Sequence, residues 1–282
     1  MPTRLYHGNP RPRASERSER ARTLGRPGRA SEAKRGRWWA GIVRAVRDTL
    51  PILILQTGDP VASVAERRGP FANMIRETIG DVWQGPYEVV DARAGDPETK
   101  RWKMVVITGS SANVPTREPW IVRTEAWLRG LVAESVPTFG ICFGHQLLAQ
   151  ALGGEVIRNP RGREIGTKKI VRRADDWLFE GLPKEMFANV THIDTVGRLP
   201  EGAVSLAFST LEDHQAIRFS EVCYGVQYHP EIDADIMRGY IETRREILAS
   251  EGLSADALLA ETSDAQPGAE TLRNFVKRFA SR

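Results

Sequence analysis

The stretch that decides the fold is Thr138-Phe139-Gly140-Ile141-Cys142-Phe143-Gly144-His145-Gln146. It predicts a buried strand that runs to Cys142 and a helix that begins directly after it. Glycines two residues before and two residues after Cys142 let the backbone turn sharply, because no side chain stands in the way. This is the arrangement of a nucleophile elbow with sulfur in place of oxygen. Free N–H groups at a helix N-terminus stabilise a thiolate, so Cys142 is a candidate nucleophile; the alternative is a core cysteine at a tight turn.

A second segment, Gly225-Val226-Gln227-Tyr228-His229-Pro230-Glu231, places a histidine at the end of a predicted strand. Pro230 favours extended backbone at His229, and in extended backbone residues i and i+2 share a face. Glu231 can therefore lie beside His229. A base with a carboxylate that orients it completes a nucleophilic triad. Taken alone, the segment also fits a surface histidine near a turn with a solvated glutamate.

Outward from these two segments, short apolar strands alternate with helices. We expect strands at 52–55, 87–90, 104–108 and 136–142, and helices at 61–79 (broken near Gly69-Pro70), 118–132 and 144–152. Further short strands at 155–158, 166–171, 204–208, 216–219 and 224–228 indicate antiparallel additions, and helices are expected at 232–248 and 270–279. The alternation predicts an α/β fold with an open, mostly parallel sheet flanked by helices. Both candidate segments then lie at carboxyl ends of strands, where such folds place their sites.

The composition of the 282 residues, 41% hydrophobic and 27% charged, is typical of a soluble globular protein. No stretch approaches the roughly 18–20 apolar residues of a membrane span. Two cysteines exclude a disulfide-stapled secreted scaffold, and residues 1–37 contain no apolar core of a signal peptide. We therefore expect a cytoplasmic protein without a membrane partner.

The positive charge of the chain belongs to its N-terminal segment. Residues 1–47 carry twelve Arg, one Lys and three Glu, a net charge of +10, whereas the other 235 residues hold 27 basic and 33 acidic groups, a net charge of −6. Nucleic-acid binding by the folded part is therefore not expected. We predict that residues 1–50 are a basic, disordered extension, with a short amphipathic helix at 38–50. A targeting presequence, an electrostatic tether and a segment without function, from a start codon assigned too early, remain alternatives.

The two segments together resemble the class I glutamine amidotransferases, whose domain has a flavodoxin-like sheet and a Cys-His-Glu triad. The motifs G-I-C-F-G-H-Q and V-Q-Y-H-P-E carry the resemblance. Ile107-Thr108-Gly109-Ser110 is similar to the family's oxyanion-strand turn, and Thr191–Val196 resembles the H-x-D-x-V segment of the GMP-synthase branch. The resemblance covers roughly residues 51–248, and we expect residues 249–282 to form a C-terminal helical segment that packs on this domain.

The resemblance implies a role for each matching residue. Cys142 attacks the γ-carboxamide of glutamine, His229 transfers the proton, and Glu231 orients His229. The N–H groups of Gly109 and Phe143 form the oxyanion hole. The substrate contacts that it implies are Gln146 and, for the ammonium group, Glu164. The remaining residues of the motifs are expected to be structural: His145 in packing, His192 and Asp194 at the edge of the site, and Cys223 as an inert core thiol.

No motif for using ammonia is evident. Residues 249–282 contain nothing like the ATP-pyrophosphatase loop of GMP synthase, and no G-x-x-x-x-G-K-[ST] motif occurs. We therefore expect hydrolysis of glutamine to glutamate and ammonia through a γ-glutamyl thioester, with no metal or cofactor; a separate synthase subunit is a candidate partner. The alternative is a γ-glutamyl peptide hydrolase that uses the same triad. A non-enzymatic binding module with a decayed site is less favoured, because the triad is complete.

Overall fold

The computed structural model describes residues 50–97 and 101–281. Apart from Leu50, the helix expected at 38–50 lies outside these residues. The first half of the described chain consists of β1 (Ile52–Gln56), α2 (Ala62–Arg68), α3 (Phe71–Ile79), η1 (Gly80–Val82), β2 (Tyr87–Asp91), β3 (Met104–Ile107), η2 (Val114–Thr116), α4 (Pro119–Ala133), β4 (Thr138–Ile141) and α5 (Phe143–Ala151). The expected break of the helix at 61–79 falls at Gly69-Pro70, between α2 and α3.

The second half of the chain is rich in short strands, as the sequence predicts. Its elements are β5 (Glu155–Arg158), β6 (Glu164–Arg172), η3 (Trp177–Phe179), β7 (Glu185–His192), β8 (Asp194–Arg198), β9 (Val204–Phe208), β10 (Ala216–Arg218), β11 (Cys223–Val226), α6 (Ala234–Thr243), α7 (Arg245–Ser250), α8 (Ala255–Glu261) and α9 (Gln266–Ala280). The sequence analysis missed β7, β8 and α8, and it joined α6 and α7 into one helix. Arg244, with φ −106° and ψ 13°, separates these two helices.

Nine strands form one sheet in the order β2-β1-β3-β4-β11-β10-β9-β6-β7. The five strands from β2 to β11 are parallel, and the pairs from β11 through β7 are antiparallel. The expected α/β fold with a mostly parallel, flavodoxin-like portion and antiparallel additions is confirmed. A separate antiparallel pair joins β5 to β8.

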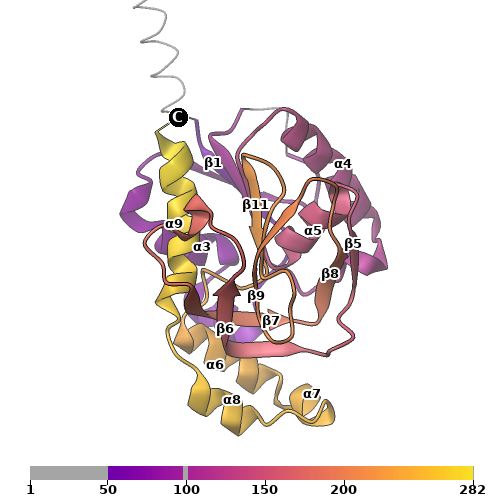
Figure 1. Ribbon diagram of the computed structural model, residues 1–282, viewed down its shortest axis with the longest axis vertical. Helices are drawn as coiled ribbons and strands as arrows, with labels where there is room; N and C mark the ends of the chain where they lie inside the picture. The colour runs from indigo at the N-terminus through magenta and orange to yellow at the C-terminus, as the bar shows by residue number, and fades with distance from the viewer. Residues whose placement is uncertain (1–49, 98–100, 282) are drawn as a thin grey trace, which may run out of the picture. The chain divides into compact units, whose positions relative to one another are not determined.

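Alternate residues of the central parallel strands face two different cores, which is why β1, β3 and β4 are almost entirely apolar. On β1, Ile52 and Ile54 belong to one buried cluster, and Leu53 and Leu55 belong to the other. The first cluster is covered by α3 and α9, and the second by α4 and α5. Figure 1 shows the two helix pairs on either side of the sheet. Both faces of the central strands are therefore shielded from solvent.

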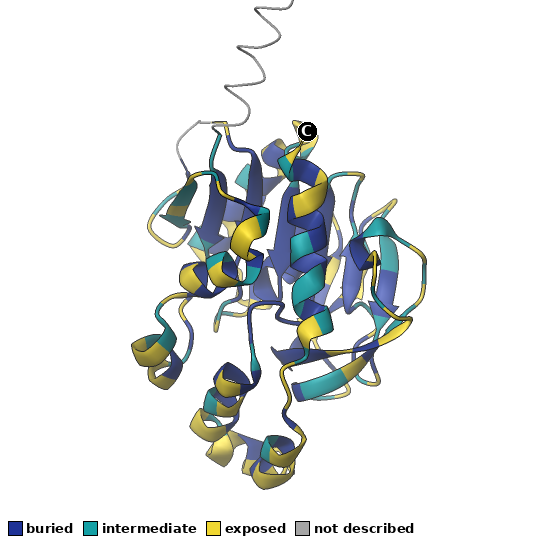
Figure 2. Cartoon of the chain, turned by 90° about the vertical axis from the view of Figure 1, so that its left-hand side faces the viewer, coloured by how far each residue is buried: buried dark blue, intermediate teal, exposed yellow. Residues whose placement is uncertain are grey.

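The C-terminal helix α9 is amphipathic. Its Leu272, Phe275, Val276 and Phe279 are buried in the first cluster, and its opposite side is exposed (Figure 2). The helices α6, α7 and α8 lie together at one end of the molecule (Figure 1), where α6 and α8 contact β6. The described residues, 50–97 and 101–281, belong to one compact unit. None of the helices within the described ranges is long and apolar enough to cross a membrane.

Candidate active site

The turn between β4 and α5 brings Cys142 to the carboxyl end of the parallel sheet. Cys142 has φ 49° and ψ −101°, a strained conformation for a residue with a side chain. The flanking glycines make this turn sterically feasible. A Cβ on Gly140 would lie 2.6 Å from the backbone of Gly144, and a Cβ on Gly144 would lie 2.7 Å from the carbonyl oxygen of Ile107. The nucleophile elbow expected from the sequence is therefore present in the backbone.

His229 and Glu231 follow β11, the strand that pairs with β4. Nδ1 of His229 lies 2.8 Å from Oε1 of Glu231, and both residues are only 4% exposed. The carboxylate accepts the Nδ1 proton, which leaves Nε2 as the nitrogen that can exchange a proton with the reacting atoms. Nε2 is buried and has no other hydrogen-bond partner among the described side chains. Phe71 stacks on the imidazole with ring centroids 6.4 Å apart.

The electrostatics of this arrangement favour a thiolate and an imidazolium. Burial would raise the pKa of Cys142, but the adjacent His229 lowers it below the ordinary thiol value. Burial would lower the pKa of His229, but the Glu231 carboxylate and the Cys142 sulfur raise it to about 10. Cys223 has no such partner, and burial raises its pKa. Cys142 is thus the activated thiol and Cys223 the inert one.

Two backbone N–H groups are available beside the sulfur. The N–H of Phe143 is in the first turn of α5, where helical amides have no intrahelical acceptor. The hydroxyl of Thr57 donates to the carbonyl of Thr108 at 2.9 Å, and this bond fixes the plane of the peptide that carries the Gly109 N–H. Gly109 also leaves no room for a side chain beside the imidazole, because a Cβ added there would lie 2.9 Å from Cε1 of His229. The geometry is compatible with the oxyanion hole expected from Gly109 and Phe143.

Two buried glutamines connect the sulfur to the neighbouring loop. Nε2 of Gln146 donates to the backbone oxygen of Asp194 and to Oε1 of Gln227, both at 2.9 Å. Nε2 of Gln227 in turn donates to Sγ of Cys142 at 3.4 Å. The sequence analysis quoted Gln227 within the histidine motif but gave it no role. Its position two residues before His229 is the signal that could have found it, because residues i and i+2 share a face in extended backbone.

A family model supports the assignment made from this geometry. Residues 85–242 match the model described as glutamine amidotransferase class-I, and this match includes the elbow and the His-Pro-Glu segment. The chain belongs to the class I glutamine amidotransferases. It is therefore an enzyme, and its expected likeness to free-standing members and to the glutaminase part of GMP synthase is confirmed.

Individual relatives of this amidotransferase carry two kinds of name. Gamma-glutamyl peptidase 5 of Arabidopsis thaliana is 28% identical, over 80% of this chain and 93% of its own. A glutamine-hydrolyzing GMP synthase subunit of Methanopyrus kandleri is 33% identical, over 60% of this chain and 88% of its own. Among solved structures, a glutamine amidotransferase from Thermotoga maritima has the same fold, with a TM-score of 0.66, 22% identity, and 82% of this chain and 99% of that one covered.

The amidotransferase has two adjoining cavities at the triad. The sulfur-side cavity is lined by residues that include Cys142, Phe143, Gln146, His192 and Asp194. The histidine-side cavity, of about 230 Å³, is lined by residues that include Val61, Phe71, His229 and Tyr240. Ser110, Ser111, Thr191 and Arg244 line both cavities. The sequence analysis named neither Arg244 nor a histidine-side cavity, because Arg244 lies at the α6–α7 junction in a region without a motif, and the cavity is assembled from segments far apart in the sequence.

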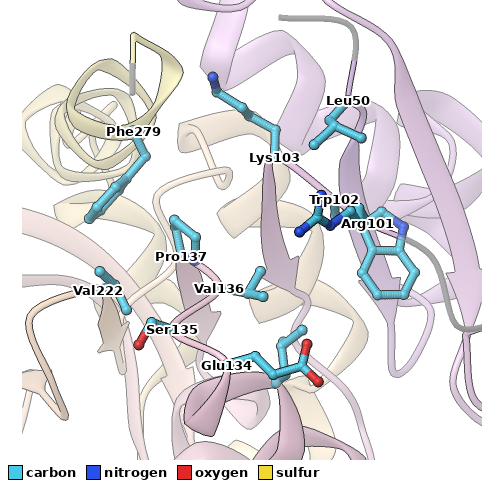
Figure 3. Close-up of a pocket in the computed structure, with 11 residues that line it drawn as sticks. Leu50, Arg101, Trp102, Lys103, Glu134, Ser135, Val136, Pro137, Val222 and Phe279 are labelled. Atoms are coloured by element: carbon cyan, nitrogen blue, oxygen red, sulfur yellow. The ribbon is translucent and has the colours of Figure 1, made fainter. Parts of the chain in front are cut away.

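Another cavity of about 400 Å³ contains none of the site residues. Figure 3 shows Leu50, Lys103, Pro137 and Phe279 around it. Its walls come from segments that precede β3, β4 and β11, so it lies at the amino ends of these strands, opposite the elbow. Within the described residues, no group of three or more His, Cys, Asp or Glu side chains could hold a metal ion.

The structure does not bring Glu164 to the substrate cavities. Its side chain is 2% exposed, and it pairs across β6 and β7 with His192, whose Nε2 lies 3.1 Å from Oε2 of the carboxylate. Ser209 and Gln215 donate to the same carboxylate, each at 2.7 Å. Every oxygen of Glu164 is therefore occupied behind the site. The expectation that Glu164 contacts the substrate ammonium does not fit this placement. The carboxylate is turned away from the cavities because it pairs with His192 on the neighbouring strand.

His192 is held between two acceptors. Its Nδ1 lies 3.0 Å from the backbone oxygen of Asp194, and its Nε2 faces Glu164. Burial would lower the pKa of His192, but Glu164 and Glu212 raise it. The ring therefore donates from both nitrogens and fixes the loop that carries Asp194. The other motif histidine, His145, is fully buried, and burial lowers its pKa to about 3, so it is neutral.

Proposed function

We propose that the protein hydrolyses the γ-amide of glutamine or of a γ-glutamyl amide through a thioester on Cys142. The observation that carries this proposal is the elbow thiol, whose pKa is lowered by a histidine that is itself held by a buried carboxylate. A decayed binding module would have no reason to keep the thiol activated. The family membership and the names of its relatives support the same chemistry.

In the first half-reaction, the sulfur of Cys142 attacks the γ-carbonyl carbon. The carbonyl oxygen becomes an oxyanion that the N–H groups of Gly109 and Phe143 stabilise. As the C–N bond breaks, His229 gives its proton to the departing nitrogen. The products of this step are a γ-glutamyl thioester and a free amine, which is ammonia when the substrate is glutamine.

In the second half-reaction, His229 takes a proton from water, and the resulting hydroxide attacks the thioester carbon. The C–S bond breaks, the thiolate returns, and glutamate leaves. The carboxylate of Glu231 keeps Nε2 of His229 aimed at the reacting atoms throughout. Gln146 and the loop at Asp194 hold the glutamyl half of the substrate in the sulfur-side cavity.

Asp194, rather than Glu164, is the acid that we propose for the substrate ammonium. It lines the sulfur-side cavity, is 7% exposed, and no described residue forms a hydrogen bond or ion pair with its carboxylate. Burial raises the pKa of Asp194, although Arg158 and His192 oppose the rise. A bound substrate ammonium would form an ion pair with the Asp194 carboxylate.

The names of the relatives suggest two different substrates, which differ in the amine that leaves. The relative named as a GMP synthase subunit favours glutamine as substrate and a separate synthase that accepts the ammonia. The relative named as a gamma-glutamyl peptidase favours a larger amine as the leaving group. The histidine-side cavity supports the second candidate, because ammonia alone does not need about 230 Å³ beside the general acid.

Kinetics on the purified chain test the proposal. Glutamine and γ-glutamyl dipeptides should be hydrolysed, and mass spectrometry of quenched enzyme should find a γ-glutamyl adduct on Cys142. Cys142→Ser should abolish both signals, and His229→Ala should abolish the adduct, whereas Glu231→Ala should leave residual activity. Turnover that survives Cys142→Ser, or an adduct on Cys223, would refute the mechanism.

A further inference from the structure

Arg244 differs from the other arginine at the site because no carboxylate neutralises it. Arg163 lines the sulfur-side cavity but is paired with Glu251 at 2.7 Å. Arg244 forms no ion pair with any Asp or Glu in the described ranges. Its Nη1 donates to the hydroxyl of Thr191, and its guanidinium lies 5.0 Å from the ring centroid of Tyr240. A guanidinium keeps its charge at all working pH values, so Arg244 offers unused donors to an anion.

The position of Arg244 places these donors in the walls of the two cavities at the triad. It sits at the junction of α6 and α7 and lines both the sulfur-side and the histidine-side cavity. The other charged groups of the histidine-side cavity already have partners: Asp59 is paired with Arg93 at 2.7 Å, and His229 is paired with Glu231 at 2.8 Å. Arg244 is therefore the charged residue of this cavity whose side chain can pair with a ligand of opposite charge.

The chemistry of the triad distinguishes the two cavities. The glutamyl half stays bonded to Cys142 in the thioester, so it occupies the cavity that contains the sulfur. The departing nitrogen must be within reach of His229, which donates its proton, so the leaving amine occupies the cavity that contains the imidazole. The walls of this cavity include Val61, Phe71 and Tyr240, which can pack against an apolar side chain.

We propose that Arg244 binds a carboxylate carried by the leaving amine, so that the preferred substrates are γ-glutamyl amino acids, whose leaving amine carries a free α-carboxylate. In an amino acid, a single carbon separates this carboxylate from the amine nitrogen. An amine at His229 therefore brings its carboxylate into the same cavity as Arg244. A guanidinium binds a carboxylate through charge-assisted hydrogen bonds, which are stronger than neutral ones. This inference rests on the thioester mechanism proposed above and names its substrate class.

The test compares three substrates that share the γ-glutamyl group: γ-glutamylalanine, γ-glutamylalaninamide and glutamine. We expect wild-type kcat/KM to be highest for γ-glutamylalanine. Arg244→Gln should lower kcat/KM for γ-glutamylalanine by roughly 10–100-fold and change the other two little. Arg244→Lys should recover part of the loss. The matched control is Arg245→Gln, because Arg245 is adjacent but pairs outside the site with Glu242 and Asp256.

Two results would overturn the inference while leaving the thioester mechanism intact. Equal losses on all three substrates would assign the guanidinium to the α-carboxylate of the glutamyl half, which every substrate carries. No loss on γ-glutamylalanine, or equal wild-type rates for the acid and its amide, would show that no carboxylate is bound there. If the wild-type protein hydrolysed none of the three and formed no adduct on Cys142, the proposed function would fail, and this inference would fail with it.

Discussion

Cys142 and His229 carry opposite charges over a window of pH that their shifted pKa values define. The pKa of Cys142 is lowered and that of His229 is raised to about 10, so the charged pair exists between these values. Alkylation of Cys142 by iodoacetamide should therefore proceed well below the ordinary thiol pKa and slow only as the pH falls through the lowered value. His229→Ala removes the cation, so the transition should move to higher pH, as rate measurements across pH would show.

Cys223 is the internal control for this titration. It is fully buried and burial raises its pKa, so it should stay unlabelled under native conditions and react only after unfolding. Peptide mapping separates the two thiols. A transition of Cys142 that is the same in wild type and His229→Ala would show that the histidine does not activate the sulfur.

Gly109 has two proposed tasks, since its N–H is assigned to the oxyanion hole and its position leaves no room for a side chain beside the imidazole of His229. Gly109→Ala should lower kcat by about a hundredfold, because a Cβ only 2.9 Å from Cε1 must displace the imidazole. The backbone of Gly109 has no positive φ, so the fold should tolerate alanine. Thermal unfolding should stay close to wild type. A variant with normal kcat would show that the imidazole position is not critical.

At the scale of elements, the elbow depends on the close contact of β4, α5 and β3. Gly140→Ala should destabilise the protein by about 1–3 kcal/mol, because the new methyl group would meet the backbone of Gly144 at 2.6 Å. The matched control is Gly130→Ala in the exposed part of α4, where a Cβ has no neighbour within 4 Å. That change should instead stabilise by about 0.5–1 kcal/mol. Urea denaturation measures both, and equal effects would contradict this account.

The sequence predicted the elements whose patterns are local. Apolar strands buried on both faces and the G-x-C-x-G turn specify β1, β3, β4 and the elbow without further context. The break between α6 and α7 could not be predicted, because Ile241 and Leu248 continue the helical spacing across Arg244. The strand β7 was missed because its place at the sheet edge depends on pairing with β6 and on cover from α9.

The residues of the site also fall into those that a local motif predicts and those that depend on tertiary packing. Cys142, His229 and Glu231 follow from motifs, since glycines flank Cys142 at two residues on either side and Pro230 stands between His229 and Glu231. The positions of Glu164 and Arg244 follow from tertiary packing: one depends on the register of β6 with β7, the other on a helix junction. No local pattern encodes either position, so the family resemblance implied a substrate contact for Glu164, and Arg244 was not identified.

At the scale of the whole molecule, α9 joins the last residues of the chain to the strand that carries the nucleophile. Phe275 is fully buried, and its ring lies 5.0 Å from that of Phe139 on β4. Phe275→Ala should therefore destabilise the protein by about 3–5 kcal/mol in urea denaturation. Lys277→Ala, on the exposed side of the same helix, should change stability by less than about 0.5 kcal/mol. A Phe275 variant as stable as wild type would show that α9 is dispensable.

The neighbours of β4 in the sheet also determine when activity can arise during synthesis. On one side β4 pairs with β3, which precedes it, but on the other it pairs with β11, which leaves the ribosome much later. His229 follows β11, and α9 is later still. A nascent chain that has exposed Cys142 therefore has neither its base nor the cover of its core, so its thiol keeps ordinary reactivity. Amide cleavage therefore cannot begin until the ribosome has made the chain through His229 and α9.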